Sequence, residues 1–136
     1  GLMPPCSTYH RFAVGMTGDK MSSSKPESTI FMDDEIESME RKVKRAISGG
    51  QPTVEEHRRL GGDVSKDVAY QYLQFFFESD DAALAEVKSE YESGRMLAGE
   101  VKQICIDRAT DWLIDLKQKR DQMEDSVADF LAPDAI

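Results

Sequence analysis

The chain has few of the residues that cross-link small folds. Its 136 residues include two cysteines and two histidines. Cys6 and Cys105 lie far apart and form no CxxC pair, and His10 and His57 are too isolated to complete a zinc site with them. We therefore expect free thiols, no metal site and a cytoplasmic protein rather than a disulfide framework.

The sequence also lacks any long run of apolar residues. No basic leader followed by an apolar stretch stands at its start. We therefore expect neither a membrane span nor a signal peptide. The length is enough for one domain with a modest core.

Positive charge is scarce as well. Lys and Arg number 17 against 26 Asp and Glu, which gives a formal net charge of −9. Overall charge therefore cannot hold a nucleic acid, and any such contact has to use local basic clusters. The candidates are Arg41, Lys42, Lys44 and Arg45, then Arg58 and Arg59, then Lys117, Lys119 and Arg120. Each cluster is equally well explained as the solvated face of a helix.

The most informative string in the chain is Lys20-Met21-Ser22-Ser23-Ser24, in a segment that also contains Gly15, Gly18 and Pro26. A lysine and three hydroxyls suit a mobile loop that closes over nucleotide phosphates, because the ammonium can follow charge onto a pyrophosphate leaving group. Serine hydroxyls and backbone N–H groups add donors around the same anion. Taken alone, the string is also typical of an ordinary polar surface loop.

The Lys20–Ser24 string resembles the KMSKS-type signature of class I aminoacyl-tRNA synthetases, here in a KMSSS form. Downstream segments narrow the resemblance to the tryptophanyl-tRNA synthetases of archaeal and eukaryotic type. These segments are residues 48–58 (SGGQPTVEEHR), 61–63 (GGD), 67–68 (DV), 72–76 (YLQFF) with 80–81 (DD), and 91–100 (YESGRMLAGE). The match runs in order from Ser7 to Pro133, and the ordered set is more specific than any one segment.

The resemblance implies an enzyme that activates tryptophan with ATP, expected together with Mg²⁺, and transfers it to tRNA(Trp). The implied ATP-binding residues are Lys20, Met21, Ser22, Ser23, Ser24 and Lys25. Lys20 would supply a cation at the pyrophosphate, the serines would supply hydrogen-bond donors, and Met21 would pack near the adenine. The commonest form of the motif has a second lysine where this chain has Ser23. We hypothesise that Lys25 takes over part of that role.

The other half of such a catalytic site is missing from the sequence. The family's second nucleotide motif, His-x-Gly-His, appears nowhere, and no full strand–helix alternation predicts a Rossmann sheet. We therefore expect the C-terminal portion of a longer, homodimeric enzyme, inactive alone. Residues 1–33 would be the last edge of a Rossmann-type catalytic domain, and residues 34–136 a helical anticodon-binding domain.

Apolar spacing predicts a mainly α fold, with a bundle of about five helices over residues 34–131. Asp34 would cap the first helix, which ends at Gly49-Gly50. A capping box at Thr53 opens the second, which ends near residues 61–62. The third would cover 65–78 with a core stripe of aromatics, the fourth would run from 80–81 to 94, and the last would run from 99 to 131 and bury Cys105. A short extended piece is expected at 30–32.

The resemblance places anticodon contacts in the loop between the first two of these helices. The implied tRNA-binding residues are Gly49, Gly50, Gln51, Pro52 and Thr53, with Arg58, Arg59, Lys117 and Arg120 as basic candidates. The two glycines would allow close backbone approach, and Gln51 would hydrogen-bond a base edge. Relatives often carry charged residues where this chain has Gln51 and Pro52. A helix C-cap and turn also accounts for the glycine pair.

Two alternatives stay open on the sequence. A tyrosyl-tRNA synthetase shares the Lys20–Ser24 loop and a helical C-terminal domain, although the strings around Gly49, Gly61 and Gly94 favour tryptophan. A non-catalytic helical tRNA-binding module would keep the loop only as a vestige.

Overall fold

The computed structural model describes residues 6–8 and 12–123. In this part of the chain α1 runs over Ile36–Arg45, α2 over Val54–Leu60, α3 over Val68–Tyr72, α4 over Asp81–Glu92 and α5 over Ala98–Met123. A short 3-10 segment, η1 (Pro26–Ser28), precedes them, and a π-helical segment, η2 (Leu73–Phe77), continues α3. The described residues contain no β-strand, only an isolated antiparallel bridge between Val14 and Lys20. The predicted mainly α fold is confirmed for these residues.

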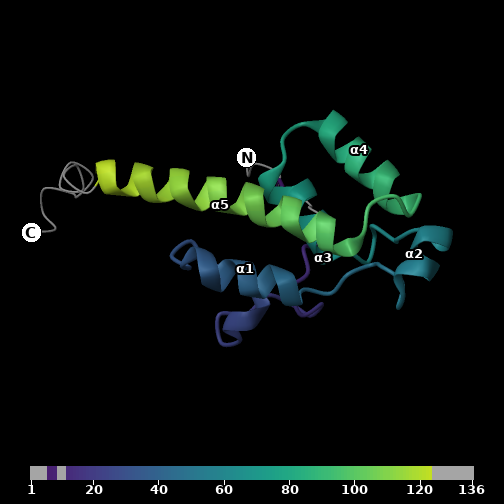
Figure 1. Cartoon of the computed structure of the whole chain (residues 1–136). Coiled ribbons are helices and arrows are strands. Elements are labelled where there is room, and N and C mark those ends of the chain that lie inside the picture. The colour runs from purple at the N-terminus through teal and green to yellow at the C-terminus, as the bar shows by residue number, and fades with distance from the viewer. Residues whose placement is uncertain (1–5, 9–11, 124–136) are drawn as a thin grey trace, which may run out of the picture.

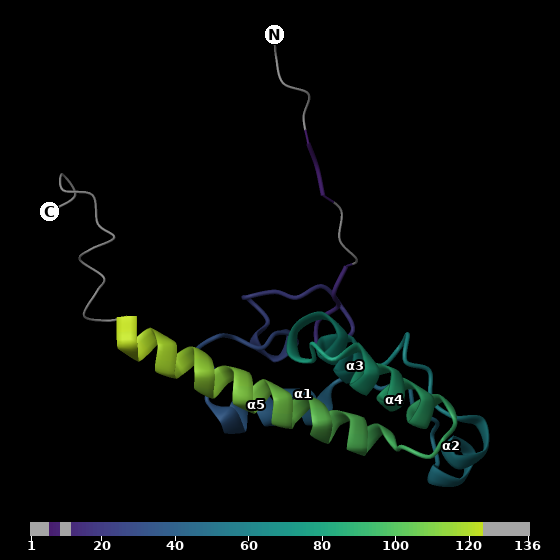
Figure 2. The same ribbon diagram turned by 90° about the horizontal axis from the view of Figure 1, so that it is seen from above.

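The long helix α5 organises the molecule (Figure 1). Helices α1, α3 and α4 and segment η2 all contact it. In Figure 1, α1 and α4 lie on opposite sides of α5, and α2 lies beyond its first turn. The view from above in Figure 2 shows the last turns of α5 extending past the other helices. No helix in the described part of the chain is long and apolar enough to cross a membrane.

One apolar core joins these helices to the segment before them. The fully buried apolar side chains include Met39 and Val43 of α1, Val68 and Leu73, Tyr91, and Val101 and Cys105 of α5. Met16, which precedes the first helix, is 1% exposed and belongs to the same core. The burial of Cys105 is as predicted, and burial raises the pKa of its thiol to about 12.

The bounds of α2 and the start of α4 agree with the predictions, whereas α1 ends at Arg45, before the predicted end at Gly49-Gly50. Thr53 Oγ1 accepts from the Glu56 backbone N–H at 3.1 Å, so Thr53 caps α2, and the helix ends at Gly61. The Asp80 carboxylate accepts from the N–H groups of residues 82 and 83 and caps α4 in the same way. Residues 124–131 of the predicted last helix lie outside the described residues.

The prediction that Asp34 caps the first helix is wrong. Helix α1 begins at Ile36, and Glu35 occupies the N-cap without a side-chain bond. The Asp34 carboxylate instead accepts from the Phe31 N–H at 2.8 Å and from Lys42 Nζ at 2.6 and 2.8 Å. Lys42 is itself buried rather than part of a solvated cluster, because its side chain is 3% exposed and lies over the Phe31 ring. A buried ammonium needs an anionic partner, and Asp34 supplies it.

Three further expectations differ from the structure. The third helix begins at Val68, where Asp67 caps it, and it widens into the π-helical η2 instead of continuing regularly to residue 78. Phe76, predicted to lie on the core face, is 52% exposed. Residues 30–32 form no strand, and a turn begins at Met32.

Candidate functional site

The Lys20 loop, residues 20–25, projects from a tight turn in the chain. Gly15 N–H donates to the Asp19 carbonyl at 2.6 Å, and the bridge between Val14 and Lys20 closes the turn. Gly18 has φ +83° within it, which favours glycine. The Lys20 side chain is therefore exposed at the start of the loop.

The three serines form a second turn next to this lysine. Lys25 N–H donates to the Ser22 carbonyl at 3.0 Å, and the hydroxyls of Ser22 and Ser24 lie 2.9 Å apart. Ser23, Ser24 and Lys25 are exposed. Within residues 12–123, neither lysine of the loop forms an ion pair with a carboxylate. The loop thus presents two ammonium groups and a set of hydroxyls on one exposed segment, which suits an anionic ligand.

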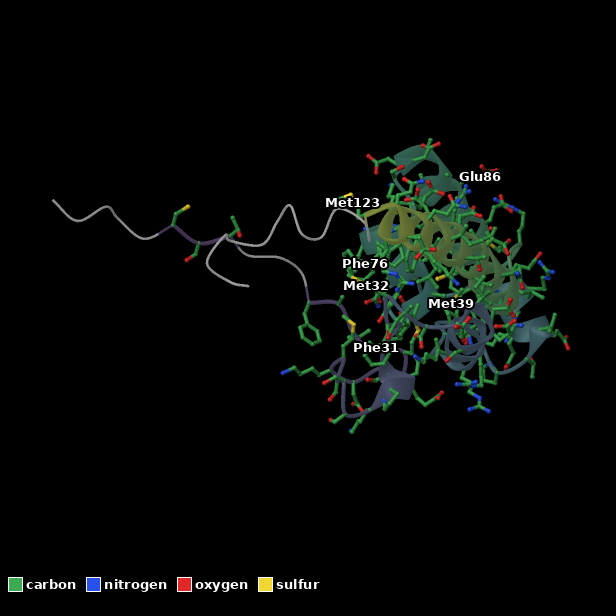
Figure 3. The ribbon with its side chains drawn as sticks, turned by 90° about the vertical axis from the view of Figure 1, so that its left-hand side faces the viewer. Phe31, Met32, Met39, Phe76, Glu86 and Met123 are labelled. Atoms are coloured by element: carbon green, nitrogen blue, oxygen red, sulfur yellow. The ribbon has the colours of Figure 1, made fainter. Side chains whose placement is uncertain are left out.

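Met21 is the residue of the loop that turns inward. It is partly buried, and the Tyr72 hydroxyl donates to its sulfur at 3.3 Å. Burial raises the pKa of Tyr72 to about 12, so this hydroxyl remains a donor at neutral pH. Beside Met21 is an apolar hollow of about 440 Å³, lined by Ile30, Met32, Tyr72, Phe75, Phe76, Phe77 and Trp112. Figure 3 shows Met32 and Phe76 close together on one side of the molecule.

The second candidate region is the turn between α1 and α2. The Gly49 N–H donates to the buried Asp67 carboxylate at 3.1 Å, and the Gly49 carbonyl accepts from Asp63 N–H at 2.9 Å. The Tyr91 hydroxyl donates to the same Asp67 carboxylate at 2.8 Å. Burial, and next the charge of Asp67, raise the pKa of Tyr91. Gly49 is thus held by Asp63 and by Asp67, the N-cap of α3, and Tyr91 of α4 binds the same Asp67 carboxylate.

Several chain segments pack closely against one another at this turn, and a glycine lies at each point of close approach. We call these glycines together the glycine junction. Its members are Gly49, Gly50, Gly61, Gly62 and Gly94. A Cβ on Gly49 would overlap the Asp63 carbonyl, and one on Gly61 would overlap the Glu92 carbonyl. The sequence analysis interpreted these glycines as helix ends, and Gly49 and Gly50 also as points of close approach to tRNA, but it did not predict these contacts between backbones.

The exposed side of the turn forms a shallow pocket of about 250 Å³, lined mainly by residues 48–54 and by residues 97–99 at the start of α5. Gln51 and Pro52 are exposed there. The Gln51 side-chain amide donates to the Gly61 carbonyl at 3.0 Å, and its backbone N–H lies 3.4 Å from His57 Nδ1. The turn that lines the pocket is therefore hydrogen-bonded to residues of α2 and of its C-terminal end.

The basic candidates do not gather in one place. Arg58 lies on α2 next to the turn, and its guanidinium donates to the carbonyls of Gly94 and Arg95. Arg59 is exposed on the same helix. Lys117 and Arg120 lie on α5 about 28 Å or more along the helix from its start, at 1.5 Å per residue. There they line a different pocket, of about 150 Å³, together with residues 32–36.

Two polar residues that hold these regions were not identified from the sequence. Asp67 accepts from Gly49, Tyr70 and Tyr91. Its position before an apolar run is an N-cap signal that could have indicated the start of α3 at Val68 instead of the predicted start at Ser65. Ser28 is 1% exposed and binds the Lys20 loop from inside. No local pattern distinguishes Ser28 from its serine neighbours.

The sequence also matches a family model. The model described as "tRNA synthetases class I (W and Y)" matches residues 1–113. The chain belongs to this family. The fold of this part of the chain is thus that of a class I tRNA synthetase.

Curated relatives and solved structures agree with the predicted resemblance. The tryptophan–tRNA ligase of Saccharolobus solfataricus is 42% identical over 133 residues, which cover 96% of this chain and 35% of the relative. The tryptophan–tRNA ligase of Methanocaldococcus jannaschii is 40% identical over 130 residues, with the same coverage. The crystal structure of tryptophanyl-tRNA synthetase from Aeropyrum pernix K1 superposes with a TM-score of 0.81 at 35% identity, over 84% of this chain and 31% of that one.

The synthetase chain described here spans about a third of the length of these curated relatives. Its match includes the Lys20 loop and the glycine junction, which both fall within residues 1–113. The predicted resemblance to tryptophanyl enzymes is confirmed.

Proposed function

We propose that this chain is the C-terminal part of a tryptophan–tRNA ligase, which activates tryptophan with ATP and transfers it to tRNA(Trp). The ordered similarity to tryptophan–tRNA ligases over 96% of the chain carries this proposal. In it, residues 1–33 complete the catalytic domain and residues 34–136 form the anticodon-binding domain. The isolated chain is expected to be inactive, because the sequence has no His-x-Gly-His motif.

The Lys20 loop is the part of the chain assigned to ATP. Adenylate formation moves negative charge onto the leaving pyrophosphate, so cations and donors placed there stabilise the transition state. The exposed ammonium of Lys20 supplies the cation, and the hydroxyls of Ser22, Ser23 and Ser24 supply donors. Lys25 stands on the same exposed turn and adds a second cation. Mg²⁺ is expected together with the ATP phosphates. The described residues contain no group of three or more His, Cys, Asp or Glu that could hold a metal.

The turn at residues 49–53 is assigned to the tRNA anticodon. Its support is the exposed pocket of about 250 Å³ beside a backbone that is hydrogen-bonded to Asp63 and Asp67. Gln51 has one amide N–H committed to Gly61, so a base would be recognised through the rest of the amide. Arg58 and Arg59 lie beside this turn. Lys117 and Arg120 would contact a different part of the tRNA, since they lie far along α5.

The test is amino-acid-dependent ATP–pyrophosphate exchange by the full-length enzyme, with tryptophan and tyrosine compared. We expect exchange with tryptophan and a loss of about 100-fold in kcat for Lys20→Ala. Lys25→Ala tests the second cation, and an unchanged rate would remove Lys25 from the site. The matched control is Lys66→Ala, which removes an exposed lysine that pairs with Asp63 outside the loop.

Each other outcome selects a different function. Exchange with tyrosine alone would assign the chain to the tyrosyl enzymes, which the same family model includes. Exchange with neither amino acid would favour a non-catalytic helical tRNA-binding module. Sedimentation of the same preparation tests the proposed homodimer.

A further inference from the structure

Ser28 is a buried serine whose side chain contacts both ends of the serine turn. It closes segment η1 and is 1% exposed. Its Oγ accepts from the Ser22 N–H at 3.1 Å. The same hydroxyl donates to the Lys25 carbonyl at 2.7 Å, with the Ser22 carbonyl a longer alternative at 3.3 Å. A hydroxyl has one hydrogen, so the shorter bond to Lys25 is the principal one.

The backbone of Ser28 is fixed to the core. Its carbonyl accepts from Met16 N–H at 3.0 Å, and its N–H donates to the Lys25 carbonyl at 2.9 Å. Met16 is buried, and its own carbonyl accepts from Ile47 N–H beyond the end of α1. The serine therefore connects an exposed loop to an immobile part of the molecule.

We propose that Ser28 is a positioning residue for the ATP step: its hydroxyl holds the Ser22–Lys25 turn so that the loop's ammonium groups and hydroxyls meet the phosphates. The inference rests on the proposed function of the Lys20 loop. Ser28 does not touch the ligand, since it is buried beneath the loop. Without its hydroxyl, the Ser22 N–H loses its partner and the turn occupies the competent arrangement for a smaller fraction of the time.

The next residue provides a matched control. Thr29 Oγ1 is also buried, yet among the described residues it has no hydrogen-bond partner. Thr29→Val removes a hydroxyl from the adjacent position while keeping the side-chain shape. It leaves every contact between Ser28 and the loop in place.

The kinetic test compares Ser28→Ala, Ser28→Cys and Thr29→Val in tryptophan-dependent ATP–pyrophosphate exchange by the full-length enzyme. Ser28→Ala is expected to raise KM for ATP about tenfold and leave KM for tryptophan within about twofold. Ser28→Cys keeps a weak donor of similar size and should fall between the alanine variant and the wild type. A merely structural role would reduce the active fraction, which lowers kcat and leaves both KM values unchanged.

Hydrogen–deuterium exchange of residues 20–28 in the same variants tests the anchor without catalysis. We expect faster exchange of the Ser22 amide in Ser28→Ala and unchanged exchange in Thr29→Val. Unchanged hydrogen–deuterium exchange of the loop in Ser28→Ala would overturn the proposal. Equal KM values for ATP in active Ser28→Ala and Thr29→Val enzymes would overturn it as well. If the wild type shows no ATP–pyrophosphate exchange with any amino acid, the ATP role of both the loop and Ser28 is overturned. Faster hydrogen–deuterium exchange of the loop in Ser28→Ala would still establish that Ser28 anchors the loop.

Discussion

The Lys20 loop and the glycine junction are held in opposite ways. The loop has mostly exposed side chains. Its attachments include the bridge from Lys20 to Val14, the contact of Met21 with Tyr72, and the hydroxyl and backbone N–H of Ser28. At the junction, the backbones of Gly49, Gly61 and Gly94 each lie directly against the backbone of another segment. The difference fits the proposed function, in which the loop would have to move to close over ATP, whereas a surface that reads bases would gain from being rigid before it binds.

Because of this difference, we expect mutations in the loop and mutations at the junction to affect different properties. Substitutions in the loop remove exposed groups, so they should lower activity and leave stability almost unchanged. Substitutions at the junction introduce overlap or break buried hydrogen bonds, so they should lower stability first.

The largest loss of stability is expected from Gly61→Ala. Gly61 has φ +74°, and a Cβ there would overlap the Glu92 carbonyl. We expect a loss of about 3 kcal/mol or more in the free energy of unfolding, measured by urea denaturation. Gly99→Ala is the control, because a Cβ at Gly99 meets nothing within 4 Å and the residue lies in α5. It should gain about 0.5 kcal/mol or more. Equal stability of the two variants would contradict the close packing of the junction.

The next largest loss of stability is expected at the buried ion pair between Lys42 of α1 and Asp34, which precedes the helix. Lys42→Met is expected to cost about 3 kcal/mol, because it leaves the Asp34 carboxylate, 11% exposed, without its cation. Lys44→Met breaks the pair with Glu40, in which the two side chains are 58% and 36% exposed. Its cost should stay below about 0.5 kcal/mol. Thermal unfolding of both variants measures their difference in stability. A similar shift in Tm for the two would show that burial does not strengthen the Lys42–Asp34 pair.

Much of the fold could be predicted because its signals are local. The side chains of Thr53 and Asp80 accept from backbone N–H groups two or three residues later, so a short stretch of sequence is enough to indicate these caps. The Lys20 loop was found in the same way, from a short string. The burial of Cys105 followed from its place in an apolar stripe.

The misses share a physical cause, which is that each depends on contacts or backbone geometry that no short capping signal specifies. Asp34 has the residue type of a cap, but a buried Lys42 eight residues later claims its carboxylate. Gly49 and Gly61 look like helix ends, and only the assembled structure shows which carbonyls exclude a side chain. Phe76 fits the spacing of an α-helix, but the π-helical turn rotates it out of the core.

A smaller effect is expected from Tyr91→Phe, which leaves the packing of the junction in place. It removes the hydrogen bond from the Tyr91 hydroxyl to the buried Asp67 carboxylate and should cost about 1.5 kcal/mol at pH 7. Because burial and the charge of Asp67 raise the pKa of Tyr91, the native state favours the neutral phenol. That contribution is present below pH ~10 and is lost as the pH rises further. Urea denaturation at pH 7 and pH 11 measures both effects, and identical alkaline losses in variant and wild type would contradict this role.

The smallest effect is expected from Ser65→Ala, at the edge of the junction. The Ser65 hydroxyl, and next Lys66, lower the pKa of Asp63 from 3.8 to about 2. A carboxyl with a lowered pKa contributes stability that is present above pH 3.8 and lost as the pH falls through about 2. The substitution should therefore raise the pKa of Asp63 toward 3.8 and change only the acid limb of the stability curve. An NMR titration of the Asp63 carboxyl carbon measures this. An unshifted pKa would assign the lowering to Lys66 and to the Ser65 backbone N–H, which both remain in the variant.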